Sequence, residues 1–155
     1  MTIAATFIAT NVLAARRQYS TTELRIMAAG VIATNGNPES IPPSVLAGFA
    51  LVESSGINCG PYPDGNTKAF GLFGFHLSRW LECGGLPEEW GRATEMRQME
   101  VMYVALQRYA AAARRHHSTE RIRFAANAHH YGHGSDFNTE YAKKIEAAIE
   151  RAQAD

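Results

Sequence analysis

Apolar residues recur at helical spacing along most of this chain, and one segment rich in glycine and proline interrupts them. This pattern predicts a mainly α-helical fold with a small irregular or hairpin insertion between helices. The expected helices cover about residues 2–16, 22–35, 43–54, 77–81, 94–117, 118–128 and 138–152.

The segment 57–74 holds the only strand candidate. Its Asp64-Gly65 pair is typical of the tight turn of a β-hairpin, and the sequence KAFGLFGF follows at 68–75. We therefore expect the insertion to include a small hairpin.

The length of 155 residues favours one domain, with N-terminal helices over 1–38 and a core over 40–150. Lys and Arg number 15, and so do Asp and Glu. This neutral balance argues against nucleic acid as a partner, because phosphate binding needs an excess of positive charge. No apolar window reaches the roughly 18 residues of a membrane span.

The N-terminal stretch MTIAATFIATNVLAARR resembles a signal peptide in size only. No positive residue precedes its apolar part, and Arg16 and Arg17 follow it. We expect an amphipathic helix here and no signal peptide.

Cys59 and Cys83 lack the spacing of a metal or redox motif, so two free thiols and a single disulfide both remain open.

Glu53 lies on the apolar face of the predicted helix 43–54. Leu46, Phe49 and Ala50 precede it at helical spacing, so its carboxylate continues the apolar stripe. It also falls in the last turn, where the helix dipole disfavours an anion. Desolvation and the dipole both raise a carboxyl pKa, as a general acid requires near neutral pH. Glu53 is therefore a candidate general acid; the alternative is a helix end that turns it toward water.

The segment after Glu53 has the composition of a sugar-binding groove. A polar loop leads to GLFGFH at 71–76, whose glycines let the backbone approach a ligand. The neighbouring aromatic residues offer flat apolar surfaces: Phe70, Phe73 and Phe75. Trp80 and Trp90 are either further sugar platforms or parts of the core. An acid beside such a groove is suited to a sugar polymer.

Four segments resemble, in order, motifs of the soluble lytic transglycosylase and goose-type lysozyme superfamily. They are PPSVLAGFALVESSGIN at 42–58, KAFGLFGFH at 68–76, AHHYGHG at 128–134 and EYAKKI at 140–145. In that superfamily a helix ends in a catalytic Glu followed by Ser, and a GLMQ-like turn, an AYNAGPG-like segment and a YxxKV-like helix follow. The resemblance covers about residues 40–150 and implies a lysozyme-like helical domain.

The resemblance implies cleavage of the β-1,4 bond between N-acetylmuramic acid and N-acetylglucosamine in peptidoglycan. Glu53 would protonate the leaving oxygen and then, in a lytic transglycosylase, take the proton of the muramoyl 6-hydroxyl as an anhydro ring closes. This route needs one carboxylate and no cofactor, whereas most glycosidases need two carboxylates. Hydrolysis by a muramidase needs a base, for which Asp64 and Glu82 are the nearby loop candidates.

The same resemblance assigns substrate-binding positions around the acid. They are Ser54, Gly71, Leu72, Phe73, His76, His129, His130 and Tyr131. The chain departs from the family pattern at Gly74, where Gln is usual, and it lacks the proline that commonly follows that turn.

The third segment admits two alignments with the family. Aligning its glycines, at 132 and 134, places His129 and His130 on the usual Tyr and Asn. Aligning Asn127 instead places Ala126 on the Tyr. We prefer the glycine alignment because two glycines fix a backbone turn. In it, His129 or Tyr131 is the candidate to replace the Tyr that orients the catalytic Glu.

His129 and His133 are four residues apart, a spacing at which two helical histidines can share a metal ion. Gly132 and Gly134 interrupt the helix, and no HExxH arrangement is present, so we expect no metal site. The histidines are then either structural or solvated side chains, or they line the groove.

The expected partner is the peptidoglycan glycan strand. The lack of a signal peptide and the short domain favour a bacteriophage virion protein, carried to the bacterial cell wall or periplasm by the particle, with tail or baseplate proteins as further partners. The alternative from another class is a catalytically inactive structural module of a phage tail or secretion apparatus. The altered second and third segments favour this alternative, and the retained Glu53 opposes it.

Overall fold

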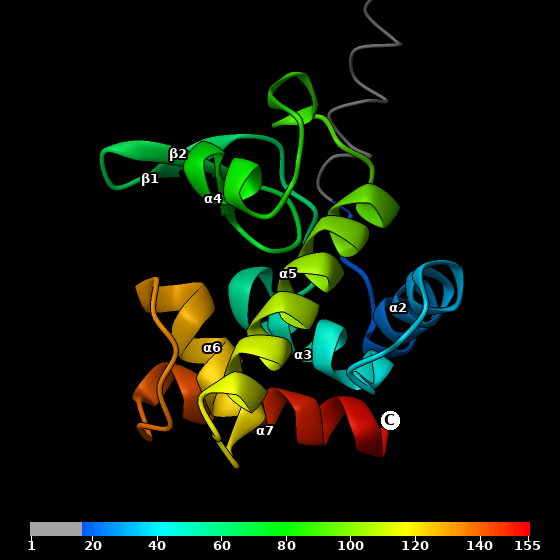
Figure 1. The fold of residues 1–155 in the computed structure, drawn as a ribbon. Coiled ribbons are helices and arrows are strands. Elements are labelled where there is room, and N and C mark those ends of the chain that lie inside the picture. The colour runs from blue at the N-terminus through cyan, green and yellow to red at the C-terminus, as the bar shows by residue number, and fades with distance from the viewer. Residues whose placement is uncertain (1–16) are drawn as a thin grey trace, which may run out of the picture.

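The computed structural model describes residues 17–155, and this part of the chain is mainly α-helical, as predicted (Figure 1). Its α-helices are α2 (Thr21–Asn35), α3 (Pro43–Ser54), α4 (Leu77–Glu82), α5 (Glu95–Arg115), α6 (Arg121–Tyr131) and α7 (Glu140–Ala154). A 3-10 turn covers Pro87–Glu89. The predicted helix 2–16 lies outside the described residues.

The long helix α5 joins two parts of the molecule. Figure 1 shows the sheet and α4 gathered near its N-terminal half, while α6 lies beside its C-terminal half. Helix α3 packs against α2, α5 and α7, and α6 packs against α5 and α7. Glu53, near the C-terminal end of α3, therefore lies where the helices meet the sheet region.

Several helix boundaries follow from local signals. Thr94 and Thr139 cap α5 and α7 by accepting hydrogen bonds from backbone N–H groups in the first turn. Pro43 occupies the first turn of α3, where its missing N–H is not needed. Ser20 caps α2, because Ser20 and Glu23 form a reciprocal capping box, and the helix begins at Thr21.

Helix α6 differs most from the prediction. We expected a helix over 118–128, whereas α6 covers Arg121–Tyr131 and ends at Gly132, which has a φ of 82°. A left-handed glycine is the usual stop for a helix, so Gly132 sets the end one turn later than expected. His129, His130 and Tyr131 consequently belong to the helix and not to a loop.

The predicted hairpin is present. Strand β1 (Tyr62–Asp64) pairs antiparallel with β2 (Thr67–Phe70), and β3 (Phe75–His76) pairs with the other edge of β2. Asp64 lies opposite Thr67, so the two turn residues are Gly65 and Asn66, one position later than the expected pair.

The aromatic residues of the inserted segment pack in the core. Phe70, Phe73, Phe75 and Trp80 are each at most 1% exposed, and their rings contact one another. The expectation of flat, accessible aromatic surfaces is therefore wrong for Phe70 and Phe75, and Trp80 belongs to the core. Phe73 is also buried, but it borders the cavity described below. Burying large apolar rings stabilises a small lobe that has few other core residues.

The two cysteines are not linked to each other. Cys83 is buried and Cys59 half-buried, and both are free thiols, so the disulfide alternative is not realised.

Of the helices within residues 17–155, none has the length and apolar character needed to cross a membrane.

Candidate active site

The Glu53 side chain lines a polar cavity of about 440 Å³, which lies between the end of α3, the sheet, α4 and α6. That volume lies in the range of small-ligand sites. The lining residues are Glu53, Tyr62, Asp64, Phe73, Gly74, His76, Ser78, Arg79, His129 and His130. Most of them carry hydrogen-bonding groups, so the cavity is suited to a polar ligand.

The Glu53 carboxyl group is held from one side and open on the other. The Tyr141 hydroxyl donates a hydrogen bond to its Oε1 atom, and Nε2 of His129 lies 3.8 Å from the same atom. The side chain is 21% exposed. A Cβ atom at Gly74 would lie 3.6 Å from Oε2, so this glycine borders the other carboxyl oxygen.

The pKa of Glu53 is raised above its ordinary value. Desolvation by burial is the main cause, and the negative charge of Asp64 adds to it. The hydrogen bond from Tyr141 and the nearby His76 act in the opposite direction. The upward direction agrees with the sequence prediction, and it keeps the carboxyl group protonated to higher pH than an exposed glutamate.

Ser54, Gly71 and Leu72, predicted to bind substrate, instead fix the turn beside Glu53. The Ser54 hydroxyl donates to the Leu72 carbonyl at 2.8 Å, and the Leu72 N–H donates to Oε1 of Gln98 at 2.8 Å. A Cβ at Gly71 would lie 2.1 Å from that Gln98 oxygen, so only glycine fits. None of the three is among the residues that line the cavity.

Asp64 and His76 form a hydrogen-bonded pair on the opposite wall. Nε2 of His76 lies 2.7 Å from Oδ2 of Asp64, and Nδ1 lies 2.5 Å from the Thr67 hydroxyl. In a neutral imidazole, Nε2–H donates to Asp64 and Nδ1 accepts from Thr67. His76 and the base candidate Asp64 therefore lie in the same cavity as Glu53, whereas Glu82 forms an ion pair with Arg79 and does not line it.

His129 and His130 both line the cavity but differ in exposure. His129 is buried, packs edge-on against Phe49, and has no hydrogen-bond partner for Nδ1 within residues 17–155. Burial lowers the pKa of His129 to about 3, so the ring is neutral at physiological pH. His130 is exposed and stacks on the Tyr141 ring with 4.1 Å between ring centroids.

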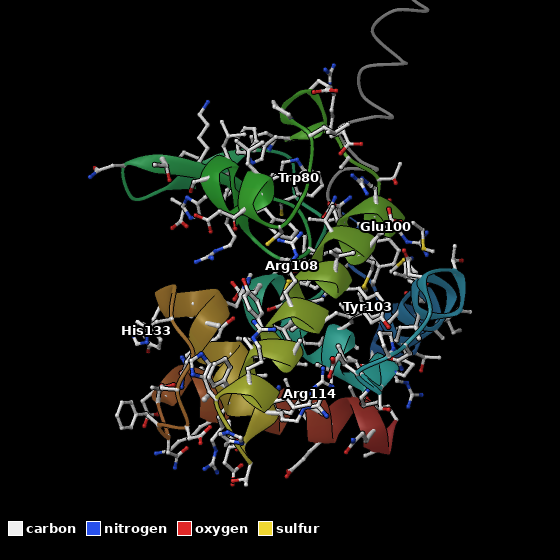
Figure 2. The ribbon with its side chains drawn as sticks, in the orientation of Figure 1. Trp80, Glu100, Tyr103, Arg108, Arg114 and His133 are labelled. Carbon is white, nitrogen blue, oxygen red and sulfur yellow. The ribbon has the colours of Figure 1, made fainter. Side chains whose placement is uncertain are left out.

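Tyr131 does not reach the carboxyl group that it was expected to orient. Its ring is 48% exposed and lies near His130 and His133, beyond the residues that line the cavity. Figure 2 shows His133 on this outer side of α6.

The residue that bonds Glu53 is Tyr141, in the fourth sequence segment. Tyr141 is a buried residue of α7 and is 9% exposed. The missed signal is the phenolic hydroxyl, because a buried tyrosine usually needs a hydrogen-bond partner. Sequence reasoning also missed Tyr62, Ser78 and Arg79, whose positions are fixed by the hairpin and α4.

Asn127 organises the loop between α6 and α7. Its side-chain amide donates to the carbonyl groups of Ser135 and Phe137, and its Oδ1 accepts from the Thr139 hydroxyl. Asn127 is fully buried, so it serves the loop and not the cavity.

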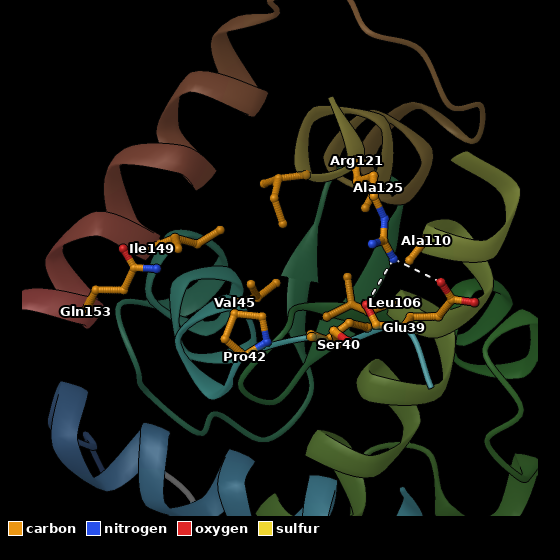
Figure 3. Close-up of a pocket in the computed structure, with 12 residues that line it drawn as sticks. Glu39, Ser40, Pro42, Val45, Leu106, Ala110, Arg121, Ala125, Ile149 and Gln153 are labelled. Carbon is orange, nitrogen blue, oxygen red and sulfur yellow. Dashed lines mark hydrogen bonds and ion pairs between the residues drawn. The ribbon is translucent and has the colours of Figure 1, made fainter. Parts of the chain in front are cut away.

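A second cavity, of about 310 Å³, lies between α3, α5, α6 and α7 (Figure 3). Its walls are mainly apolar, with Val45, Leu106 and Ile149 among them. The one carboxylate on its rim, Glu39, is bonded to Arg121 at 2.9 Å and to Arg114 at 2.9 Å. Both carboxylate oxygens of Glu39 are thus paired with arginines, so among the residues that line this second cavity no carboxyl group is left free for a ligand.

No group of three or more His, Cys, Asp or Glu side chains in the described part of the chain is arranged to hold a metal ion. Comparison with protein-family models, with curated proteins and with solved structures finds no match to this chain. The functional interpretation therefore depends on the cavity around Glu53.

Proposed function

We propose that this chain is a peptidoglycan lytic transglycosylase of lysozyme-like fold, with Glu53 as its general acid and base. The observation that carries the proposal is a buried carboxyl group of raised pKa that opens into a polar cavity. The order of the four sequence segments supports the substrate class, because Glu53 and Tyr141 belong to the first and last of them and meet in space.

The proposed reaction begins with protonated Glu53. It gives its proton to the glycosidic oxygen, and the bond from that oxygen to C1 of the muramoyl residue breaks. The resulting carboxylate then takes the proton of the muramoyl 6-hydroxyl while the hydroxyl oxygen bonds to C1. Tyr141 holds the carboxyl group in place through both steps, and the product carries a 1,6-anhydro end.

Hydrolysis by a muramidase is a second candidate, and one observation favours it. Asp64, on β1, lines the same cavity as Glu53, and a carboxylate there can accept a proton from an attacking water. His76 keeps Asp64 hydrogen-bonded in that position. The acid step at Glu53 is the same in both candidates, and only the nucleophile differs.

Digestion of purified peptidoglycan followed by mass spectrometry tests the proposal. The transglycosylase predicts muropeptides that are lighter by one water than those with reducing ends. Reducing ends from the wild type that Asp64→Asn abolishes would replace it with the muramidase. Absence of any cleavage by folded protein would leave the inactive structural module as the better interpretation.

A further inference from the structure

The geometry points to Arg79 as the residue that selects acidic glycans, by binding a carboxylate carried on the sugar strand. This inference rests on the proposed function. The carboxylate is either the lactyl group of N-acetylmuramic acid or a group of its attached peptide. Neutral strands of N-acetylglucosamine alone lack it.

Arg79 supplies the fixed positive charge of the cavity. Among its ten described lining residues, Arg79 is the one whose side chain is always cationic. Asp64 is hydrogen-bonded to His76 at 2.7 Å, and Glu53 carries the transferable proton, and so no charge, at the start of the proposed reaction. Before substrate binds, the cavity therefore presents one permanent positive charge to an anionic ligand, and this charge lies on the α4 side.

The guanidinium group of Arg79 has hydrogen-bond donors that remain available to a ligand. Within residues 17–155, the Arg79 side chain donates one hydrogen bond, from Nη1 to Oε2 of Glu82 at 2.8 Å. Nε and Nη2 are thus free to donate to a ligand. Glu82 is 63% exposed, so water screens its charge and the pair leaves the Arg79 charge only partly compensated.

Arg79 is also fixed in place. Its side chain is 24% exposed, and Nη1 of Arg108 donates to the backbone carbonyl of Glu82 at 2.8 Å, which ties the end of α4 to α5. Figure 2 shows Arg108 on the face of α5 that is turned toward α4. A largely buried guanidinium on a fixed helix has less side-chain freedom to lose when it binds a carboxylate.

The test compares three forms of one glycan: intact peptidoglycan, strands stripped of peptide that keep the lactyl carboxylate, and stripped strands whose carboxylates are converted to amides. We expect the wild type to cleave strands bearing carboxylates at least about tenfold more efficiently, mainly through a lower KM, as a charge-assisted hydrogen bond provides. The first two substrates show whether the peptide or the lactyl group supplies the carboxylate.

Variants assign the preference to this side chain. Arg79→Gln should lose the preference and cleave charged and amidated strands with equal efficiency, while Arg79→Lys should keep part of the preference. Glu82→Gln removes the ion pair but keeps the arginine, so it should retain the preference. Arg115→Gln is the matched control, because Arg115 is exposed and lies outside the cavity.

The outcomes separate the two proposals. Wild-type protein that cleaves none of the three strands overturns the proposed function and this inference with it. Cleavage of charged and amidated strands with equal efficiency by the wild type overturns the inference alone, whether or not Arg79→Gln folds. Equal loss in Arg79→Gln and Glu82→Gln would likewise overturn it, because a structural ion pair would then be the cause.

Discussion

The hydroxyl of Tyr141, at the start of α7, donates a hydrogen bond to Glu53, at the end of α3, across 88 residues of sequence. The two helices pack closely along the chain's core, so the bond is a consequence of their packing. It fixes one oxygen of the only carboxyl group that lines the cavity from the helical side within residues 17–155. The other oxygen, next to Gly74, faces the space available to a ligand.

Replacing Glu53 with glutamine tests its role as the acid. Glu53→Gln keeps the shape of the side chain and removes the transferable proton, so peptidoglycan cleavage should fall by at least about 100-fold. The rate of release of soluble muropeptides measures it. Glu82→Gln makes the same change on an exposed carboxyl group outside the cavity and should retain activity within about twofold. Cleavage by Glu53→Gln at the wild-type rate would remove Glu53 from the mechanism.

Tyr141→Phe tests the hydrogen bond. Because the bond lowers the pKa of Glu53, its removal should raise that pKa further. A general acid is lost as pH rises through its pKa, so the alkaline limb of the pH–rate profile should move to higher pH. The maximal rate should fall, because the carboxyl group is less well oriented. Stability should drop by about 1 kcal/mol for one lost hydrogen bond. An unmoved alkaline limb would mean that Tyr141 only fills the core.

Much of the fold is predictable because its signals are local. The Thr94 and Thr139 caps, the proline at the start of α3 and the hairpin turn each act within a few residues. The error in α6 has the same origin, since we ended the helix at Ala128 and Gly132 ends it in the structure. Local composition distinguishes these two positions poorly because His and Tyr have intermediate helix propensity.

The site is only partly predictable, because its parts meet through packing. Helical spacing places Glu53 on the inward face of its helix, but spacing does not say which residue of another helix it contacts, so the hydrogen bond from Tyr141 is not predictable. The same limit explains Asp64, which reaches the cavity through the pairing of β1 with β2. Phe70 and Phe75 were assigned to a groove because an aromatic side chain has the same sequence signature on a ligand surface and in a core.

Phe73→Ala should chiefly cost stability. Phe73 is 1% exposed and packs against Phe75 with 5.8 Å between ring centroids. Truncating a fully buried phenylalanine costs about 3–5 kcal/mol. Urea unfolding monitored by circular dichroism measures the change. Phe137→Ala is the matched control, because Phe137 is 74% exposed and should change stability by less than about 0.5 kcal/mol. Equal stability of the two variants would contradict this assignment.

His129 should make the protein sensitive to acid. Burial lowers its folded-state pKa to about 3, while the unfolded chain titrates near 6.5, so the unfolded state binds the proton first as pH falls. Stability from this group is complete above pH 6.5 and is lost progressively toward pH 3, at up to about 1.4 kcal/mol per pH unit. His129→Leu removes the titrating group and keeps a buried apolar side chain. Its free energy of unfolding, relative to the wild type, should therefore rise steadily between pH 6.5 and 3.

Urea unfolding at a series of pH values measures this difference. His133→Leu removes an exposed histidine near the end of the same helix and should follow the wild-type pH dependence. The sign of the effect distinguishes His129 from Glu53, whose raised pKa makes burial least costly at low pH and most costly after it ionises. A His129→Leu curve that runs parallel to the wild type over the whole range would show that the imidazole gains a proton in the folded protein. His129 would then be a second proton carrier 3.8 Å from the Glu53 carboxyl group, not a neutral wall of the cavity.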